Sequence, residues 1–315
     1  MISNKNDLRL ITEMQKNGIA SYSDLASRLG LTPKTVAKRV EGLIKSKAIT
    51  IRAQPNPYKL GLSAGAVIAI KADPSKIEHI CDLLCEHFCV NLVQTMFGRF
   101  DIMAIVYFRS WELLHKFMNE ELYAIDGVTQ TEFYFIKDVF KRYERFFDKE
   151  PFNNSSQKLD ETDWALIEEL AKDGLASQTM LAENLGVHVT TIYRRIAALV
   201  KEKMIKISGV PNPSMLKPSA NAYITVDAEP KEVQNICDTL NSYDEVHFTI
   251  TLSNRSGMLI CVHTKDTETL FEFLKKRIAP QKGLLNIETY IRAAVHKTYY
   301  AWLWDRGGAG KTRRK

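Results

Sequence analysis

An internal repeat constrains the fold of this chain more than any other feature. The tripeptide Pro-Asn-Pro occurs at 55–57 and again at 211–213, and the same offset of 156 residues places Asp7 on Asp163. A register that holds over two long segments without an insertion indicates a tandem duplication, so both copies are expected to fold alike. The offset continues through the pairs Gly18/Gly174, Leu29/Leu185, Gly30/Gly186, Arg39/Arg195, Pro74/Pro230, Cys81/Cys237, Arg99/Arg255, Gly127/Gly283 and Tyr143/Tyr299.

Each copy has two parts, which meet at its Pro-Asn-Pro. The apolar residues before the tripeptide recur with a helical period, whereas those after it form short runs typical of strands. Two prolines fix φ and favour an extended preceding residue, which suits a hinge between modules. The expected modules are 1–53 and 162–209 (helical), 54–147 and 210–302 (strand-rich), with a linker at 148–161 and a Gly-rich basic tail at 303–315.

Bulk composition indicates a soluble globular protein. Of the 315 residues, 45% are apolar and 25% are charged, and no apolar run approaches the roughly 18 residues that span a bilayer. The polar N-terminus has no secretion signal, and five cysteines, an odd number, do not suggest a disulfide framework. A cytoplasmic location is therefore expected. The net charge of +6 is mild, so the position of the charge matters more than its sum.

The helical part of each copy predicts a winged helix-turn-helix. In the first copy a helix is expected over 7–17, a second from an N-cap at Ser23, and a third from an N-cap at Thr32, with Pro33 at its first position. Three short helices, the last two joined by a tight Gly-containing turn, make a helix-turn-helix. The segment that follows, 48–54, predicts a short strand as the start of a wing.

The third helix of each copy has an apolar inner face and a basic outer face. Val36, Val40 and Leu43 face inward in the first copy, and Ile192, Ile196 and Leu199 do so in the second. Cationic and short hydroxyl side chains on the outer face suit phosphates and base edges of the major groove. A merely solvated helix is the alternative, but a basic face in both copies favours DNA. The candidate contacts are Lys34, Thr35, Lys38, Arg39, Lys45, Thr190, Thr191, Arg194, Arg195 and Lys201.

The strand-rich part of each copy predicts a ferredoxin-like βαββαβ module. In the first copy the expected strands are 64–72, 90–97, 101–108 and 128–137, and the expected helices are 75–87 and 111–123. The second copy follows the same order over 220–294. The predicted fold class is α+β, as a tandem duplication of a winged helix-turn-helix and a ferredoxin-like module.

Two segments resemble the leucine-responsive regulator/AsnC family of transcription factors. They are "SDLASRLGLTPKTVAKRVEGLIKSKAI" and "FGRFD", the latter close to a family turn between strands two and three. The resemblance implies that the ferredoxin-like modules pair through their sheets, and that small effectors, often amino acids, bind near this turn. It places the effector site at Gly98, Arg99 and Asp101. In the second copy Asn254 and Gly257 replace Gly98 and Asp101, so the acid is missing there.

The function expected from this resemblance is transcription regulation by binding double-stranded DNA, without enzymatic activity, cofactor, metal or membrane. The two modules are expected to pair within the chain, with further self-association possible. Because Lys34, Thr35 and Lys38 differ from Thr190, Thr191 and Arg194, the operator is expected to be asymmetric.

Two other functions and two chance motifs fit the sequence less well. Siroheme-type tetrapyrrole decarboxylases resemble the same architecture and would use histidines and arginines, but the first copy has no histidine on its second or third strand. A sensor acting through protein partners is the third possibility. Cys81, Cys85 and Cys89 lack metal-site spacing, and "GGAGKT" at 307–312 lacks the first glycine of a phosphate-binding loop.

Overall fold

The computed structural model describes residues 4–16, 20–57, 59–87, 89–142, 159–211 and 220–297, which form two compact units. The helical parts of both copies make one unit and the strand-rich parts make the other, with the first division between Leu60 and Gly61. Within these segments no helix combines the length and the apolar character needed to cross a membrane. Most of the expected linker, the basic tail and residues 212–213 of the second Pro-Asn-Pro lie outside the described residues.

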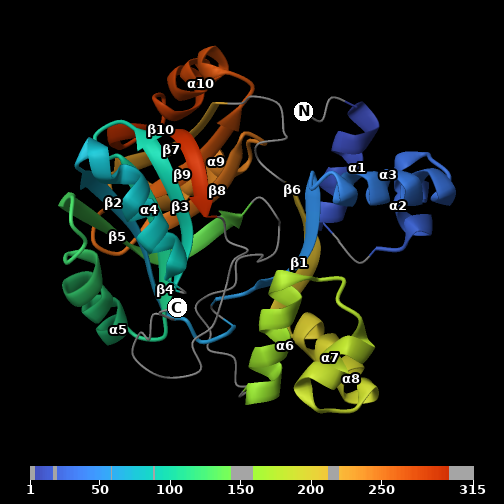
Figure 1. Cartoon of the computed structure of the whole chain (residues 1–315). Coiled ribbons are helices and arrows are strands. Elements are labelled where there is room, and N and C mark those ends of the chain that lie inside the picture. Colours follow the sequence, from blue (N-terminus) through green and yellow to red (C-terminus); the bar gives the residue numbers. More distant parts are fainter. Residues whose placement is uncertain are drawn as a thin grey trace. The chain divides into compact units, whose positions relative to one another are not determined.

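The helical unit contains two groups of three helices, which we call the first head and the second head (Figure 1). Thr32 caps the third helix of the first head as expected, since its side chain accepts from the Thr35 N–H. The expected cap at Ser23 is wrong: Ser21 accepts from the Asp24 N–H, and Ser23 lies inside the helix. The first head comprises α1 (Lys5–Lys16), α2 (Tyr22–Leu29) and α3 (Pro33–Lys45); the second comprises α6 (Glu161–Lys172), α7 (Gln178–Leu185) and α8 (Val189–Lys201).

The second head begins earlier than expected. Asp160 caps α6 by accepting from the Asp163 N–H, and the Asp163 side chain accepts in return from the Asp160 N–H. This reciprocal arrangement satisfies two of the free N–H groups at a helix start. Residues 160 and 161 therefore belong to the head and not to the linker.

The two expected wings are one shared ribbon. Strand β1 (Ile49–Pro55) pairs antiparallel with β6 (Ile205–Pro211) of the other copy, from Ile49 opposite Pro211 to Pro55 opposite Ile205. Each strand thus satisfies its backbone groups on the other copy instead of in a hairpin of its own. The Gln54 side chain also donates to the Ser208 hydroxyl across the ribbon, at 2.5 Å.

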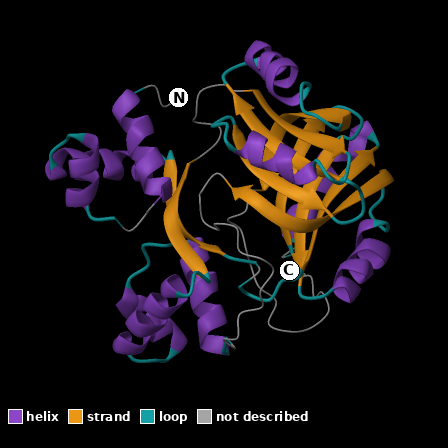
Figure 2. Ribbon diagram, turned by 180° about the vertical axis from the view of Figure 1, so that it is seen from behind, coloured by secondary structure: helices purple, strands orange, loops and turns teal. Residues whose placement is uncertain are grey.

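The ribbon gives both heads a common hydrophobic core. Helix α6 of the second head packs on β1, and α1 of the first head packs on β6. Leu10 of α1 and Leu166 of α6 are fully buried in the same cluster, together with Ile49 of the ribbon. Figures 1 and 2 show one head at each end of the ribbon. The two heads are therefore held together by packing and not only by chain connectivity.

The strand-rich unit is a closed eight-stranded barrel built from two equivalent four-stranded halves (Figure 2). The first half has the order β3-β4-β2-β5 and the second β8-β9-β7-β10, which is the ferredoxin-like order in each. The halves join where β5 pairs with β8 and where β10 pairs with β3. The strands are β2 (Ala64–Ala72), β3 (Val90–Phe97), β4 (Ile102–Phe108), β5 (Val128–Arg142), β7 (Ala220–Ala228), β8 (Val246–Leu252), β9 (Gly257–Thr264) and β10 (Leu284–Lys297).

Pairing of the modules within one chain agrees with the expectation, and it explains one difference. Strand β5 extends to Arg142, beyond the expected end at 137. The additional residues pair with β8, where Asp138 lies opposite Thr251 and Arg142 opposite Phe248. The partner that extends this strand comes from the other copy, more than 100 residues away.

Helices cover the outside of each half of the barrel. Strand residues with even numbers in β2, such as Ile68 and Ile70, pack with Cys81 and Leu84 of the covering helix. The equivalent Cys237 is also fully buried in the second half. The helical segments are η1 (Pro74–Lys76), α4 (Ile77–Glu86), α5 (Trp111–Lys116) and η2 (Phe117–Leu122) on the first half, and α9 (Val233–Asn241), α10 (Thr267–Phe273) and η4 (Leu274–Ile278) on the second.

Candidate nucleic-acid interface and effector site

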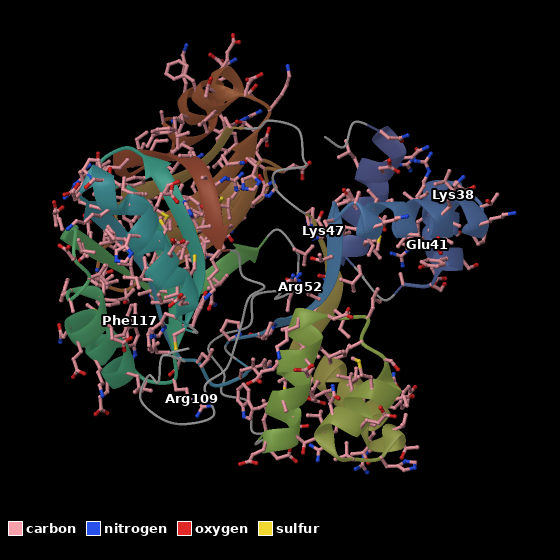
Figure 3. All side chains as sticks on the ribbon, in the orientation of Figure 1. Lys38, Glu41, Lys47, Arg52, Arg109 and Phe117 are labelled. Carbon is pink, nitrogen blue, oxygen red and sulfur yellow. The ribbon has the colours of Figure 1, made fainter. Side chains whose placement is uncertain are left out.

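Helix α3 presents a basic surface because its apolar residues fix its orientation. Val36 and Val40 are buried in the core of the helical unit, which turns the opposite face to solvent. Lys34, Lys38 and Lys45 are exposed on that face, and none forms an ion pair with a described residue. Figure 3 shows Lys38 and Glu41 on this helix. An unpaired cationic helix face is the electrostatic requirement for contacting nucleic-acid phosphates.

Helix α8 presents a different surface on the same scaffold. Its N-cap is His188, at the position of Thr32, and the imidazole Nδ1 accepts from the Thr190 N–H at 3.4 Å. Thr190, Arg194 and Lys201 are exposed, as expected, and neither Arg194 nor Lys201 pairs with a described carboxylate. The second head therefore carries fewer positive charges on its outer face than the first.

Two of the expected DNA contacts serve the fold of the heads. Arg39 donates to Asp7 at 2.6 Å, and Arg195 donates to Asp163 at 2.7 Å and to Asp160 at 2.8 Å. The Asp163 hydrogen bond raises the pKa of Arg195. The side chains of Arg39 and Arg195 are only 28% and 25% exposed. Each arginine ties the third helix to the first helix of its own head, so neither is a free cation for DNA.

The two threonines beside the basic faces are less accessible than expected. Thr35 and Thr191 are both half-buried. The Thr35 hydroxyl lies 2.9 Å from that of Thr32, within the cap of α3. Thr35 and Thr191 lie in the first turn of their helices, and the preceding residues, Lys34 and Thr190, are the exposed ones.

The prediction missed exposed residues that share this stripe. Glu41 is exposed on α3, and Tyr193 on α8 is 65% exposed. Helical spacing could have found both, because Glu41 lies three residues after the predicted contact Lys38, and Tyr193 lies three residues after the predicted contact Thr190. Lys47 and Lys203, just beyond the two helices, have left-handed backbones with φ of 56° and 55°. No sequence signal marked them, since glycine or asparagine usually occupies such positions.

The turn between β3 and β4 brings the expected effector residues together. Gly98 has φ of 147° and lies against the Tyr290 ring, where an added Cβ would be 3.2 Å from the ring. Asp101 accepts from the Lys71 ammonium at 2.9 Å and from the Ala72 N–H at 2.9 Å. Arg99 is half exposed and contacts Glu132 at 3.3 Å. The Asp101 carboxylate is therefore already paired with Lys71.

The second copy lacks an acid at position 257, as expected, but a carboxylate from a neighbouring strand lies at its turn. Asp227 of β7 occupies the position of Lys71, and both Nε and Nη2 of Arg255 donate to it. A side chain at Gly257 would collide with the Val226 carbonyl oxygen. The backbone thus excludes an acid at position 257, and Asp227 supplies one from the neighbouring strand.

A charged network joins the two turns at the barrel. Glu132 contacts Arg99 at 3.3 Å and Arg255 at 3.6 Å, and Arg99 also contacts Glu288 at 3.6 Å. Glu132 and Glu288 are equivalent residues of the two copies. The buried Tyr290 donates to Glu288 at 2.7 Å. These ion pairs form a series of alternating acidic and basic side chains that connects the turn of the first copy with the turn of the second.

Two histidines meet inside the second half of the barrel. The rings of His247 on β8 and His263 on β9 lie 3.9 Å apart between centroids. Burial lowers the pKa of His263 well below its ordinary value, and His247 and Arg292 add to this effect. The equivalent residues in the first copy are Asn91 and Tyr107. The pair is therefore specific to the second copy.

The cysteines are thiols within apolar packing. All five lie in described segments, and none forms a disulfide. Burial raises the pKa of Cys81, Cys237 and Cys261 to about 12, which keeps these thiols protonated and poorly reactive. Among the described residues, no three His, Cys, Asp or Glu side chains are grouped as metal ligands.

Comparison with known proteins matches every module. An AsnC-type helix-turn-helix domain matches residues 5–44 and 159–200. A Lrp/AsnC ligand-binding domain matches 65–146 and 221–302. An uncharacterized HTH-type transcriptional regulator of Pyrococcus furiosus is 33% identical over 143 residues, covering 45% of this chain and 97% of the relative. An HTH-type transcriptional regulator of Methanocaldococcus jannaschii is 30% identical over 137 residues, covering 43% and 92%.

A full-length structural likeness is also found. The crystal structure of the siroheme decarboxylase NirDL superimposes with a TM-score of 0.62, covering 95% of this chain and 97% of that chain. At 15% sequence identity this likeness shows the fold alone. Single-unit regulators match about half of the chain, which agrees with the duplication. The chain belongs to the Lrp/AsnC family and carries two helix-turn-helix domains and two ligand-binding domains in tandem.

Proposed function

We propose that the protein is a transcription regulator that binds an asymmetric operator with two unlike heads. The observation that carries the proposal is that α3 and α8 expose unpaired cations on one shared core, yet expose different side chains. A homodimer presents two identical helices and favours a palindrome. Here Lys34 and Lys38 of the first head are Thr190 and Arg194 in the second. Each head should therefore prefer its own half-site.

Selection from a random duplex pool tests this proposal. The full chain should enrich two half-sites of different sequence at a fixed separation, because the heads share a core. Enrichment of a perfect palindrome would contradict the asymmetry, and no enrichment at low salt would contradict DNA binding.

Variants of the exposed cations test the interface itself. Lys38→Ala and Arg194→Ala should each weaken binding, and a lost phosphate contact should reduce the salt slope by about 0.9. Lys275→Ala is the matched control, since Lys275 is exposed on η4 of the barrel unit and pairs with no described carboxylate. If the control weakened binding as much as Lys38→Ala, the helix face would not be the interface.

The effector site is proposed at Gly98, Arg99 and Asp101. Support comes from the half-exposed Arg99, which can bind a carboxylate, and from Asp101, which can bind an ammonium when Lys71 gives way. Amino acids carry both groups. A panel of amino acids should shift the thermal transition of the wild type, and Asp101→Asn should abolish the shift. A shift that survives in this variant would place the site elsewhere.

A second candidate function is a tetrapyrrole decarboxylase of the siroheme type. The observation that favours it is the His247/His263 pair beside Arg292. Arg292 forms no ion pair with a described carboxylate, so it can bind a ligand carboxylate, and a histidine can transfer a proton. Adding an iron tetrapyrrole to the purified protein and following the absorbance and the release of carbon dioxide distinguishes the two functions. Turnover that is lost in His263→Ala would favour the enzyme; no spectral change would exclude it.

A further inference from the structure

The outer stripe of each DNA-facing helix contains five positions at helical spacing, and the two heads differ at four of them. The stripe runs i, i+3, i+4, i+7 and i+11, which places the side chains on one face. In α3 these residues are Lys34, Ala37, Lys38, Glu41 and Lys45; in α8 they are Thr190, Tyr193, Arg194, Ala197 and Lys201. Only the last lysine is shared. The inference below rests on the proposed DNA binding and concerns which bases each head selects.

Glu41 is the one acid on the stripe of the first head. It is exposed near Lys38 (Figure 3), and no described lysine or arginine pairs with it. By helical spacing, Lys38 and Lys45 flank it on the same face. A carboxylate at a DNA surface is repelled by phosphates, so it costs affinity unless it accepts a hydrogen bond there. The donor that suits a carboxylate in the major groove is the N4 amino group of cytosine.

Tyr193 is the corresponding feature of the second head. Its side chain is 65% exposed, and among the described residues its hydroxyl forms no hydrogen bond and its ring no contact with another ring or a cation. The first head has Ala37 at this position. The exposed part of a large aromatic side chain gains little from folding, but in the major groove the ring can pack on the methyl group of thymine.

We propose that Glu41 and Tyr193 set the base preference of the two half-sites. Glu41 selects cytosine in the half-site of the first head, and Tyr193 selects thymine in that of the second. The lysines and Arg194 supply affinity, whereas these two residues supply the difference between the half-sites. The second head has Ala197 in place of Glu41, so it lacks the preference for cytosine, and the first head has Ala37 in place of Tyr193, so it lacks the preference for thymine.

The chain offers its own matched variants, since each substitution installs the residue of the other head. Glu41→Ala should lose the preference for cytosine at one half-site, by about tenfold, and should bind random duplexes more tightly because a negative charge is removed. Tyr193→Ala should lose the preference for thymine at the other half-site only. Glu112→Ala, an exposed acid on α5 of the barrel unit, is the control for charge and should change neither property.

A substitution in the DNA tests the thymine contact directly. Replacing the selected thymine by uracil removes one methyl group, which should lower the affinity of the wild type about fourfold and leave Tyr193→Ala unchanged. If both variants bind DNA and select the same sites as the wild type, the inference is wrong while the proposed function stands. If the wild type fails to bind duplex DNA at low salt, the proposed function itself is wrong.

Discussion

Asp227 in the second ferredoxin-like module stands where Lys71 stands in the first, so equivalent strand ends carry opposite charges. Lys71 pairs with Asp101 of its turn, and Asp227 pairs with Arg255 of the other turn. Each module therefore has an ion pair between a strand and its turn, but the basic residue lies on the strand in the first module and on the turn in the second. The two turns can therefore share a fold and still differ in the charge that they present to a ligand.

The Val226 carbonyl oxygen lies so close to Gly257 that position 257 should tolerate no side chain. Gly257→Ala should lower the free energy of unfolding by about 1–3 kcal/mol, because the new Cβ meets a backbone oxygen that cannot rotate away. Gly42→Ala is the opposite case: nothing lies within 4 Å of the added Cβ on α3, so the helix should gain about 1 kcal/mol. Denaturant unfolding measures both. Equal stability of the wild type and Gly257→Ala would contradict this account.

The pair Arg39–Asp7 predicts a role in stability separate from DNA contact. A double-mutant cycle of Arg39→Ala and Asp7→Ala should give a coupling of about 1 kcal/mol in unfolding, since the pair is partly shielded from solvent. At a temperature where all variants are folded, Arg39→Ala should reduce DNA affinity less than Lys38→Ala. A larger loss for Arg39→Ala would return Arg39 to the interface.

The left-handed backbone of Lys47 predicts that one substitution can stabilise the fold and weaken DNA binding. Lys47→Gly should raise the free energy of unfolding by about 1 kcal/mol relative to Lys47→Ala, because glycine adopts φ near 56° without the strain that a Cβ causes. Both variants lack the ammonium that follows α3, so both should bind DNA more weakly than the wild type. Calorimetric unfolding and a binding titration separate the two effects. No difference between the variants would show that the backbone is unstrained.

His87 predicts a loss of stability in mild acid. Burial lowers the pKa of His87 to about 4, with the nearby Lys297 as a second cause. Because the unfolded chain takes up this proton near pH 6.5 and the folded chain only near pH 4, the stability contributed by neutral His87 is lost as the pH falls between these values. It amounts to about 3 kcal/mol at most.

A comparison of variants isolates this effect. In the neutral ring Nδ1 accepts from the Cys89 N–H, and Nε2 faces Glu121 at 3.2 Å. Burial raises the pKa of Glu121, which acts in the opposite sense, so the titration is best measured in the Glu121→Gln background. There His87→Gln should flatten the dependence of unfolding free energy on pH between 4 and 6.5. An unchanged slope would show that His87 is not the group responsible.

Much of the architecture follows from local patterns. The repeat at an offset of 156 residues, the strand runs at 64–72 and 90–97, and the N-cap at Thr32 were all predicted, and the structure has them at those residues. These features depend on side chains within one or two turns or strand positions of each other. Such short-range preferences are present in the chain before it folds. The cap at Ser23 failed because Ser21 offered an equivalent local solution.

Only the tertiary structure decided which elements meet. Strand β1 was predicted, but the residues of its partner β6 lie 150 or more positions further along the chain, and nothing in the alternation of residues in β1 identifies that partner. The sequence pattern predicts Arg39 as a surface cation, whereas the fold pairs it with Asp7. Position 257 has no acid, and the fold supplies the carboxylate at that turn from Asp227 on another strand. Periodicity fixes which face of an element is buried, whereas contacts between distant elements depend on which edges and charges the packing brings together.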